Sequence, residues 1–182
     1  VKEVFRDFRV IETGIKHGTV TVLIDNEPLE ITTYRSESTY SDNRHPDSVT
    51  FSKTLSDDVV RRDFTMNAIA FDFSNGFCDL VNGIEDIKNE TIRCIGDAET
   101  RFREDALRIL RALRFSSVLG FSIEGNTKVA IHKCKDLLNN ISAERIREEF
   151  IKLICGKNAY NVLQEFSDVI AVFIPEIRPC IN

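Results

Sequence analysis

The spacing of hydrophobic residues changes near residues 96–100, and this change constrains the fold more than any other feature of the sequence. Before it, short β-branched segments such as 19–24 (TVTVLI) alternate with turns, whereas after it apolar residues recur every three to four positions. A period of two is typical of strands, and a period of 3.6 is typical of amphipathic helices. The sequence therefore predicts an α+β chain. Its first part would contain a mixed or antiparallel sheet with helices, and its second part would be all-helical.

The expected elements follow from the same patterns and from turn residues. Strands are predicted at 19–24, 29–34 and 91–95, with a turn at 25–28, a hairpin at 71–80 around Ser74-Asn75-Gly76, and loops at 35–56 and 81–86. Helices are predicted at 55–73, 103–119, 127–138, 142–155 and 159–170, and Gly120 is expected to end the second of them.

The segment Arg103–Phe115 (REDALRILRALRF) carries the most informative charge pattern. Its alanine and leucine residues share one arc of a helix, while Asp105, Arg108, Arg111 and Arg114 recur every third residue on the other side. A solvated helix face with an ordinary i,i+3 ion pair is one interpretation. The other interpretation is base recognition. Asp accepts a hydrogen bond and the neighbouring Arg donates one, which matches the amino group and ring nitrogen of cytosine and adenine but not the carbonyl and N–H of uracil and guanine. Such a bidentate contact gives about 1–3 kcal/mol of discrimination between bases. Arg111 and Arg114, expected to be unpaired, would then bind a triphosphate.

Two further groups of polar residues attract attention. Asp63 and Asn67 would share one face of the helix predicted at 55–73, next to Arg62. A capped surface helix explains the charges but not Asn67, which is a poor helix former. Glu30 lies on a predicted strand, where its carboxylate is either solvated or held on a rigid sheet for catalysis.

Composition excludes several functional classes. The net charge of −5 means that any site for a polyanion must be local. Five scattered cysteines without a C-x-x-C pair and three isolated histidines indicate neither a disulfide framework nor a metal-ligand cluster, and they are typical of a cytoplasmic protein with reduced thiols. No apolar run approaches about 18 residues and no signal peptide is visible, so no membrane partner is expected.

Four segments together resemble the motifs of one known family, in that family's order. They are GIKHGTVTV…LEITTYR, RRDFTMNAIAFD, CDLVNGIEDIKNETIRCIGD and REDALRILRALRF, and they are similar to motifs of the class II tRNA nucleotidyltransferases and bacterial poly(A) polymerases. The resemblance implies a polymerase-β-like nucleotidyltransferase head at 1–97 and a helical, RNA-binding neck at 98–182. The implied reaction is the untemplated addition of C and A to a tRNA 3′ end from CTP and ATP, with release of pyrophosphate.

The same resemblance implies roles for individual residues. Arg62 and Asp63, near Asn67, would lie at the phosphates and ribose of the incoming nucleotide. Asp105 and Arg108 would select the base, and Arg111 and Arg114 would bind the nucleotide as well.

The metal site of the family is only partly represented. Glu30 would be a third carboxylate near Mg²⁺, whose Asp-x-Asp ligands we expect upstream of Val1, because nothing before Gly14 supplies them. The pair Asp25-x-Glu27 has two carboxylates at the required spacing, but it lies in a predicted turn beside a proline. Since the chain opens without a methionine, we expect the N-terminal part of the head to be missing and the chain to be catalytically incomplete.

Alternatives remain within and outside the family. The long loop at 35–56 favours CCA-adding or A-adding activity over CC-adding activity, by the same resemblance. A poly(A) polymerase of the same fold would use ATP alone. A non-catalytic nucleotide- or RNA-binding module is the alternative from a different class, and the sequence does not predict an oligomeric state.

Overall fold

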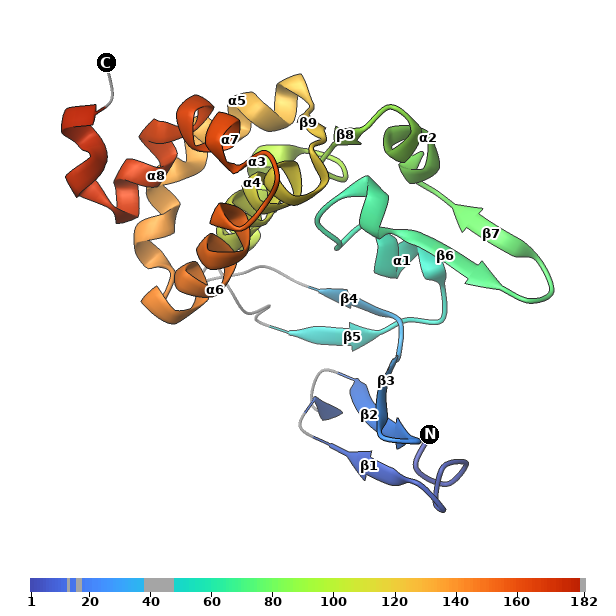
Figure 1. The fold of residues 1–182 in the computed structure, drawn as a ribbon. Helices are drawn as coiled ribbons and strands as arrows, with labels where there is room; N and C mark the ends of the chain where they lie inside the picture. The colour runs from blue at the N-terminus through green and yellow to red at the C-terminus, as the bar shows by residue number, and fades with distance from the viewer. Residues whose placement is uncertain (13, 16–17, 38–47, 181–182) are drawn as a thin grey trace. The chain divides into compact units, whose positions relative to one another are not determined.

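The computed structural model describes residues 1–12, 14–15, 18–37 and 48–180, and these residues form two compact units. One unit comprises the described residues up to 37 together with 48–61, and the other comprises 62–180. Figure 1 shows strands in the first unit and mainly helices in the second. The α+β class predicted from the sequence is confirmed.

A three-stranded antiparallel sheet forms the start of the first unit, in the order β1 (Arg9–Ile11), β2 (Thr19–Ile24) and β3 (Glu27–Thr32). The predicted hairpin is confirmed, but its turn contains only Asp25 and Asn26, both with positive φ. Two such residues favour the tight turns that match the twist of a hairpin. The turn predicted at 25–28 is therefore too long by two residues.

A second, two-stranded sheet lies where the sequence predicted a loop at 35–56. Strand β4 (Arg35–Glu37) pairs with β5 (Val49–Phe51), so the loop prediction is wrong at these positions. Strands of three residues are too short to produce an alternating hydrophobic pattern, which explains the error. The middle of the predicted loop, residues 38–47, lies outside the described residues.

The helix predicted at 55–73 is wrong beyond residue 59. Helix α1 covers Leu55–Val59 only, and a 3-10 helix follows at Thr65–Asn67. Between them, Phe64 is fully buried and forms an isolated antiparallel bridge with Cys94. Pairing with a segment thirty residues away holds the backbone extended here, and local helix propensity does not overcome it.

The hairpin predicted at 71–80 is confirmed as β6 (Ile69–Asp72) and β7 (Gly76–Asp79). The residues after it form α2 (Gly83–Lys88), where the sequence predicted a loop. The Asp79 carboxylate accepts hydrogen bonds from three backbone N–H groups at the start of α2, at 2.8 to 3.2 Å. Gly83 is required there, because a Cβ atom would lie 2.2 Å from the carbonyl oxygen of Thr65.

Helices dominate the rest of the second unit. They are α3 (Ala98–Glu104), α4 (Leu107–Leu119), α5 (Gly125–Cys134), α6 (Ala143–Ile154), α7 (Ala159–Glu165) and α8 (Ser167–Phe173). The two-residue strands β8 (Thr91–Ile92) and β9 (Ser122–Ile123) pair in parallel, so this part is not wholly helical.

Three of the predicted helices are interrupted. The helix predicted from residue 103 is divided at Asp105, which has extended backbone angles, and it ends at Gly120 as predicted. The helix predicted at 127–138 becomes a 3-10 helix at Lys135–Asn140, and the one predicted at 159–170 breaks at Phe166. The helix predicted at 142–155 is confirmed as α6.

One hydrophobic core runs through the second unit. Phe64 and Ile92 belong to the same buried cluster as Phe102, Leu110 and Leu113 of the helices. Side-chain packing is therefore continuous across residue 97, and the functional division into 1–97 and 98–182 stays a prediction. Within residues 1–12, 14–15, 18–37 and 48–180, every helix is too short or too polar to cross a membrane.

Candidate functional site

Asp63 is the centre of the polar contacts that the RRDFTMN motif makes. Its side chain is buried, and Oδ1 accepts hydrogen bonds from the backbone N–H of Phe64 at 2.8 Å and from Asn67 Nδ2 at 3.2 Å. Oδ2 lies 2.8 Å from Nε and 2.6 Å from Nη2 of Arg111. Arg62 donates to the carbonyl oxygen of Asn67 at 3.3 Å. The structure thus brings Arg62, Asp63, Asn67 and Arg111 together, although the predicted helix is absent.

The arginines of α4 each have an acidic partner in the structure. Arg108 pairs with Glu104 at 2.7 Å, Arg111 with Asp63 at 2.6 Å, and Arg114 with Glu149 at 2.7 Å. The expectation that Arg111 and Arg114 are unpaired is therefore wrong. The reason is that their partners come from positions 63 and 149, which local sequence patterns cannot connect with α4.

Asp105 and Arg108 do not lie on one uninterrupted helix face, so that expectation is also wrong. Asp105 is in the break before α4, where Oδ1 accepts the backbone N–H of Leu107 at 3.1 Å and Oδ2 lies 2.9 Å from Nη2 of Arg145. The Arg108 side chain is buried, and its Nη1 donates to Glu104 and to the carbonyl oxygen of Arg101 at 3.2 Å. An ion pair with Arg145 thus holds Asp105, and an ion pair with Glu104 holds Arg108.

Three ion-pair partners of the predicted residues are absent from the predicted nucleotide-binding set: Glu104, Arg145 and Glu149. Glu149 had a signal in the sequence, because it falls with Ile146, Phe150 and Leu153 on the apolar arc of α6, where a charged residue needs a buried partner. Glu149 is indeed buried, and its partner is Arg114. Arg114 also lies over the ring of Phe115, with its Cζ atom 4.0 Å from the ring centroid.

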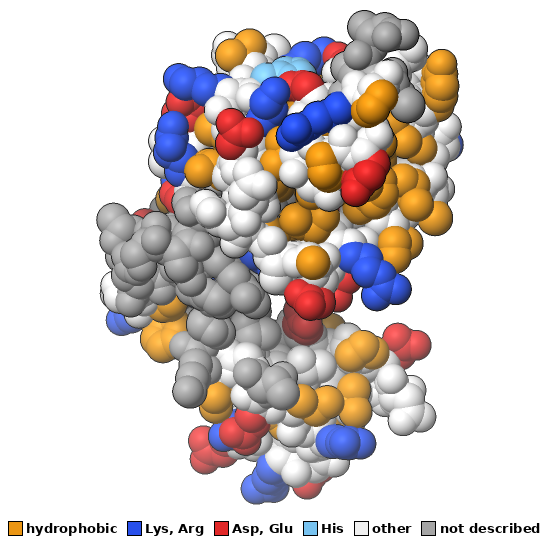
Figure 2. Space-filling model, turned by 90° about the vertical axis from the view of Figure 1, so that its left-hand side faces the viewer, with side chains coloured by type: hydrophobic (Ala, Val, Ile, Leu, Met, Phe, Trp, Pro, Cys, Tyr) orange, Lys and Arg blue, Asp and Glu red, His pale blue; other side chains and the backbone are white. Residues whose placement is uncertain are grey.

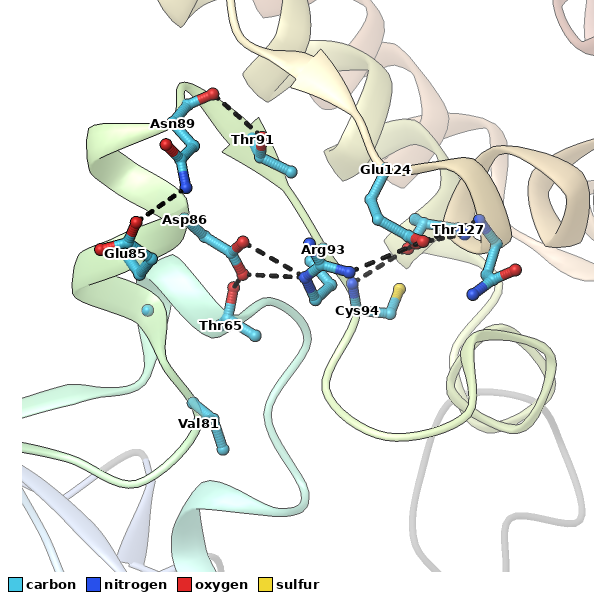
Figure 3. A network of polar contacts seen from close by, with 12 residues as sticks. Thr65, Val81, Glu85, Asp86, Asn89, Thr91, Arg93, Cys94, Glu124 and Thr127 are labelled. Atoms are coloured by element: carbon cyan, nitrogen blue, oxygen red, sulfur yellow. Dashed lines mark hydrogen bonds and ion pairs between the residues drawn. The ribbon is translucent and has the colours of Figure 1, made fainter.

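A chain of polar contacts links the 3-10 helix after Asp63 to α5 (Figure 3). Thr65 donates to Asp86 at 2.7 Å, and Arg93 lies 3.1 Å from Asp86 and 3.6 Å from Glu124. Glu124 in turn accepts the hydroxyl and the backbone N–H of Thr127. Burial raises the pKa of Glu124, but hydrogen bonds from the first turn of α5 outweigh it, so the pKa is lowered and Glu124 stays charged.

A cavity of about 350 Å³ lies beside this chain of contacts. It is lined by residues 93–94, 96–99, 124, 126–127 and 129–130, all outside the set of predicted nucleotide-binding residues. Among its charged groups, Arg93 pairs with Glu124 and Glu99 with Lys133, while the Asp97 carboxylate accepts the backbone N–H of Thr100 at the start of α3. Burial raises the pKa of Cys94 to about 12, so this thiol is not a nucleophile near neutral pH.

Glu30 belongs to the other unit, on β3 opposite Thr21 of β2, and it is exposed. Among residues 1–12, 14–15, 18–37 and 48–180, no three His, Cys, Asp or Glu side chains are placed to hold a metal ion. The carboxylates that the structure describes therefore do not fit a complete Mg²⁺ site.

Charges of both signs are mixed on one face of the molecule. On the face that Figure 2 presents, lysine and arginine side chains are mixed with aspartate and glutamate, with hydrophobic side chains between them. This mixture agrees with the modest net charge of −5.

Comparison with known proteins supports a single family. Residues 1–93 match the family described as "Poly A polymerase head domain", and residues 120–180 match "Probable RNA and SrmB- binding site of polymerase A". The CCA-adding enzyme of Lactobacillus helveticus is 53% identical over 168 residues, which are 92% of this chain and 42% of that protein.

Two solved structures show the same fold. The CCA-adding enzyme of Bacillus stearothermophilus in complex with CTP has a TM-score of 0.79 and 43% identity, and the match covers 88% of this chain and 38% of that one. A tRNA nucleotidyltransferase complexed with a primer tRNA and an incoming ATP analog has a TM-score of 0.72 and 27% identity, over 94% of this chain and 48% of that one. The chain thus spans less than half the length of these relatives. It belongs to the family of class II tRNA nucleotidyltransferases and bacterial poly(A) polymerases.

Proposed function

We propose that the protein carrying this chain adds C and A to the 3′ end of tRNA, from CTP and ATP and without a nucleic-acid template, releasing pyrophosphate. The strongest support is the 53% identity with a CCA-adding enzyme over most of the chain. The structure adds a physical basis, because the residues expected to contact base, ribose and phosphates all lie in one unit. Its partners would be CTP, ATP and the tRNA 3′ end.

Base selection would come from Asp105 and Arg108. The Asp105 carboxylate accepts a hydrogen bond from the exocyclic amino group of cytosine or adenine, and Arg108 donates to the neighbouring ring nitrogen. Uracil and guanine present a carbonyl and an N–H instead, so both contacts become unfavourable. Because ion pairs with Arg145 and Glu104 hold the two side chains, little reorganisation would be needed when the base binds.

The ribose and phosphates would be bound beside the base. We place Asp63 at the ribose, where Asn67 orients its carboxylate, and Arg62 and Arg111 at the phosphates. Arg111 is one-third exposed and paired with Asp63, so a triphosphate would compete with Asp63 for its guanidinium. Arg114, one turn further along α4, remains a proposed phosphate-binding residue, and it must exchange its contact with Glu149 to take that role.

Catalysis would also need Mg²⁺, because phosphoryl transfer in such enzymes uses metal ions held by carboxylates. Glu30 is proposed as one of these carboxylates. The described residues of this chain would contribute nucleotide selection. The cytoplasmic location inferred from the cysteines stays a prediction.

The decisive experiment is nucleotide incorporation into a defined tRNA that lacks its CCA end, using the intact gene product and each triphosphate alone or in pairs. We expect CTP alone to give a short product ending in C, and CTP with ATP to give an addition that stops at three nucleotides. Long products from ATP alone would instead identify a poly(A) polymerase. Nucleotide binding without any incorporation would identify a non-catalytic module, and efficient use of UTP or GTP would refute the proposed selectivity.

A further inference from the structure

Glu104 occupies an unusual position between two guanidinium groups. Oε1 lies 2.5 Å from Nη2 of Arg101, and Oε2 lies 2.7 Å from Nη1 of Arg108. The three side chains are largely buried, with exposed fractions of 18% for Glu104, 17% for Arg101 and 10% for Arg108. The carboxylate therefore balances the charge of a guanidinium that water reaches poorly.

The two helices at this point make the contact more than an ordinary i,i+4 pair. Glu104 is the last residue of α3, and Arg108 is the second residue of α4. Because Asp105 between them is extended, the orientation of the guanidinium is not set by the geometry of one continuous helix. Its contacts include two acceptors on α3, the Glu104 carboxylate and the carbonyl oxygen of Arg101.

Stability alone gives a weak account of this arrangement. Removing two charges from water costs free energy that a buried ion pair barely recovers, so apolar side chains would stabilise the same space at least as well. A planar guanidinium has donors in a fixed geometry, and fixing its plane fixes the direction of its N–H groups. A carboxylate that sets the orientation of the Arg108 guanidinium therefore also sets the direction in which Arg108 can donate hydrogen bonds to a base.

We propose that Glu104 is a positioning residue for base selection, which orients the Arg108 guanidinium toward the ring nitrogen of the incoming cytosine or adenine. The proposal rests on the proposed function, because it assumes that Arg108 contacts the base. Without the Glu104 charge, Arg108 loses a partner in a poorly hydrated place and reorients. Discrimination between bases then weakens, while the contacts to ribose and phosphates through Asp63 and Arg111 are unaffected.

The test compares Glu104→Gln with the parent in the intact gene product, using kcat/KM for single additions of CTP and UTP to the same tRNA. We expect the CTP-over-UTP ratio to fall by about tenfold, within the range that one bidentate base contact provides. Glu104→Asp, which keeps the charge on a shorter side chain, should restore part of the ratio. Glu99→Gln is the matched control, because Glu99 also lies on α3 but pairs with Lys133, and it should leave the ratio unchanged.

A second comparison separates positioning from a general loss of structure. In an Arg108→Ala background, Glu104→Gln should have little further effect on the ratio, because the residue through which it acts is gone. An equal loss of kcat/KM for all nucleotides, or an undiminished effect in that background, would overturn the proposal. If the parent itself does not prefer CTP and ATP, the proposed function fails first, before any variant is compared.

Discussion

The contact between Asp63 and Arg111 offers a quantitative test of how the candidate site is held together. In Asp63→Asn, the amide oxygen can accept a hydrogen bond either from the Phe64 N–H or from the Arg111 guanidinium, but not from both. The amide NH₂ group then faces the other donor, with which it cannot form a hydrogen bond. The variant loses two charge-assisted hydrogen bonds, at 2.8 and 2.6 Å. Each such bond contributes about 1.5–3 kcal/mol where it is buried. Because Arg111 is 33% exposed, water replaces part of this, and we expect a destabilisation of about 2 kcal/mol.

Urea unfolding of the chain, followed by far-UV circular dichroism of the helices, measures this change. For a slope of about 2 kcal/mol per molar urea, the midpoint should fall by about 1 M. A double-mutant cycle with Arg111→Gln isolates the pair, and we expect a coupling free energy of about 1–2 kcal/mol. Lys88→Gln is the control, because its contact with Glu85 is 3.9 Å long and exposed. A coupling below about 0.5 kcal/mol would show that the two residues are stabilised independently, and the argument would fail.

Three further predictions concern base selection, the half-buried Asp79 carboxylate and the cysteine thiols. In the intact gene product, Asp105→Ala should relax the choice among the four triphosphates more than it weakens their binding, and an equal loss for all four would contradict the assignment. Backbone hydrogen bonds outweigh burial and lower the pKa of Asp79 below its usual 3.8, so its contribution to stability is present above that value and is lost as pH falls through the lower folded-state pKa. The difference in unfolding free energy between the parent and Asp79→Asn should therefore be constant near neutral pH and shrink below about pH 4, and a difference independent of pH would refute this. Iodoacetamide near pH 8 should modify exposed Cys155 while Cys94 reacts only after unfolding, which mass spectrometry can follow; equal labelling of both in the folded chain would disprove the burial argument.

Local chemistry was enough to predict the hairpins and the end of α4. Asp25, Asn26, Gly76 and Gly120 all have positive φ, and these residue types favour that conformation wherever the rest of the chain lies. The helix over 142–155 was predictable for a similar reason, since one amphipathic face packs on the core.

Long-range packing explains where prediction failed. Phe64 pairs with Cys94 and is fully buried, which keeps the preceding segment out of a helix despite favourable local composition. Asp105 has extended backbone angles although the residue types around it favour a helix, and its carboxylate binds Arg145, forty residues away. No periodicity within a window of fifteen residues contains such information.

For the candidate site as well, some features could be predicted from the sequence and others could not. The residue types indicated hydrogen-bonding roles, and the structure places Arg62, Asp63 and Asn67 together with Arg111. What the sequence could not provide is the pairing of Asp63 with Arg111 and of Asp105 with Arg145, because the two residues of each pair are forty or more positions apart. The assigned roles in nucleotide binding stay predictions until the experiments above are done.

The continuous packing of the second unit matters to anyone who builds chimeric enzymes from this family. A junction placed after Asp97 would separate Phe64 and Ile92 from the helices that bury them, and donor and recipient halves would need matching interiors. A junction between Arg61 and Arg62 follows the division between the two compact units. Such a transplant would carry the residues proposed to contact ribose, phosphates and base to a new host as one piece, so specificity should travel with it.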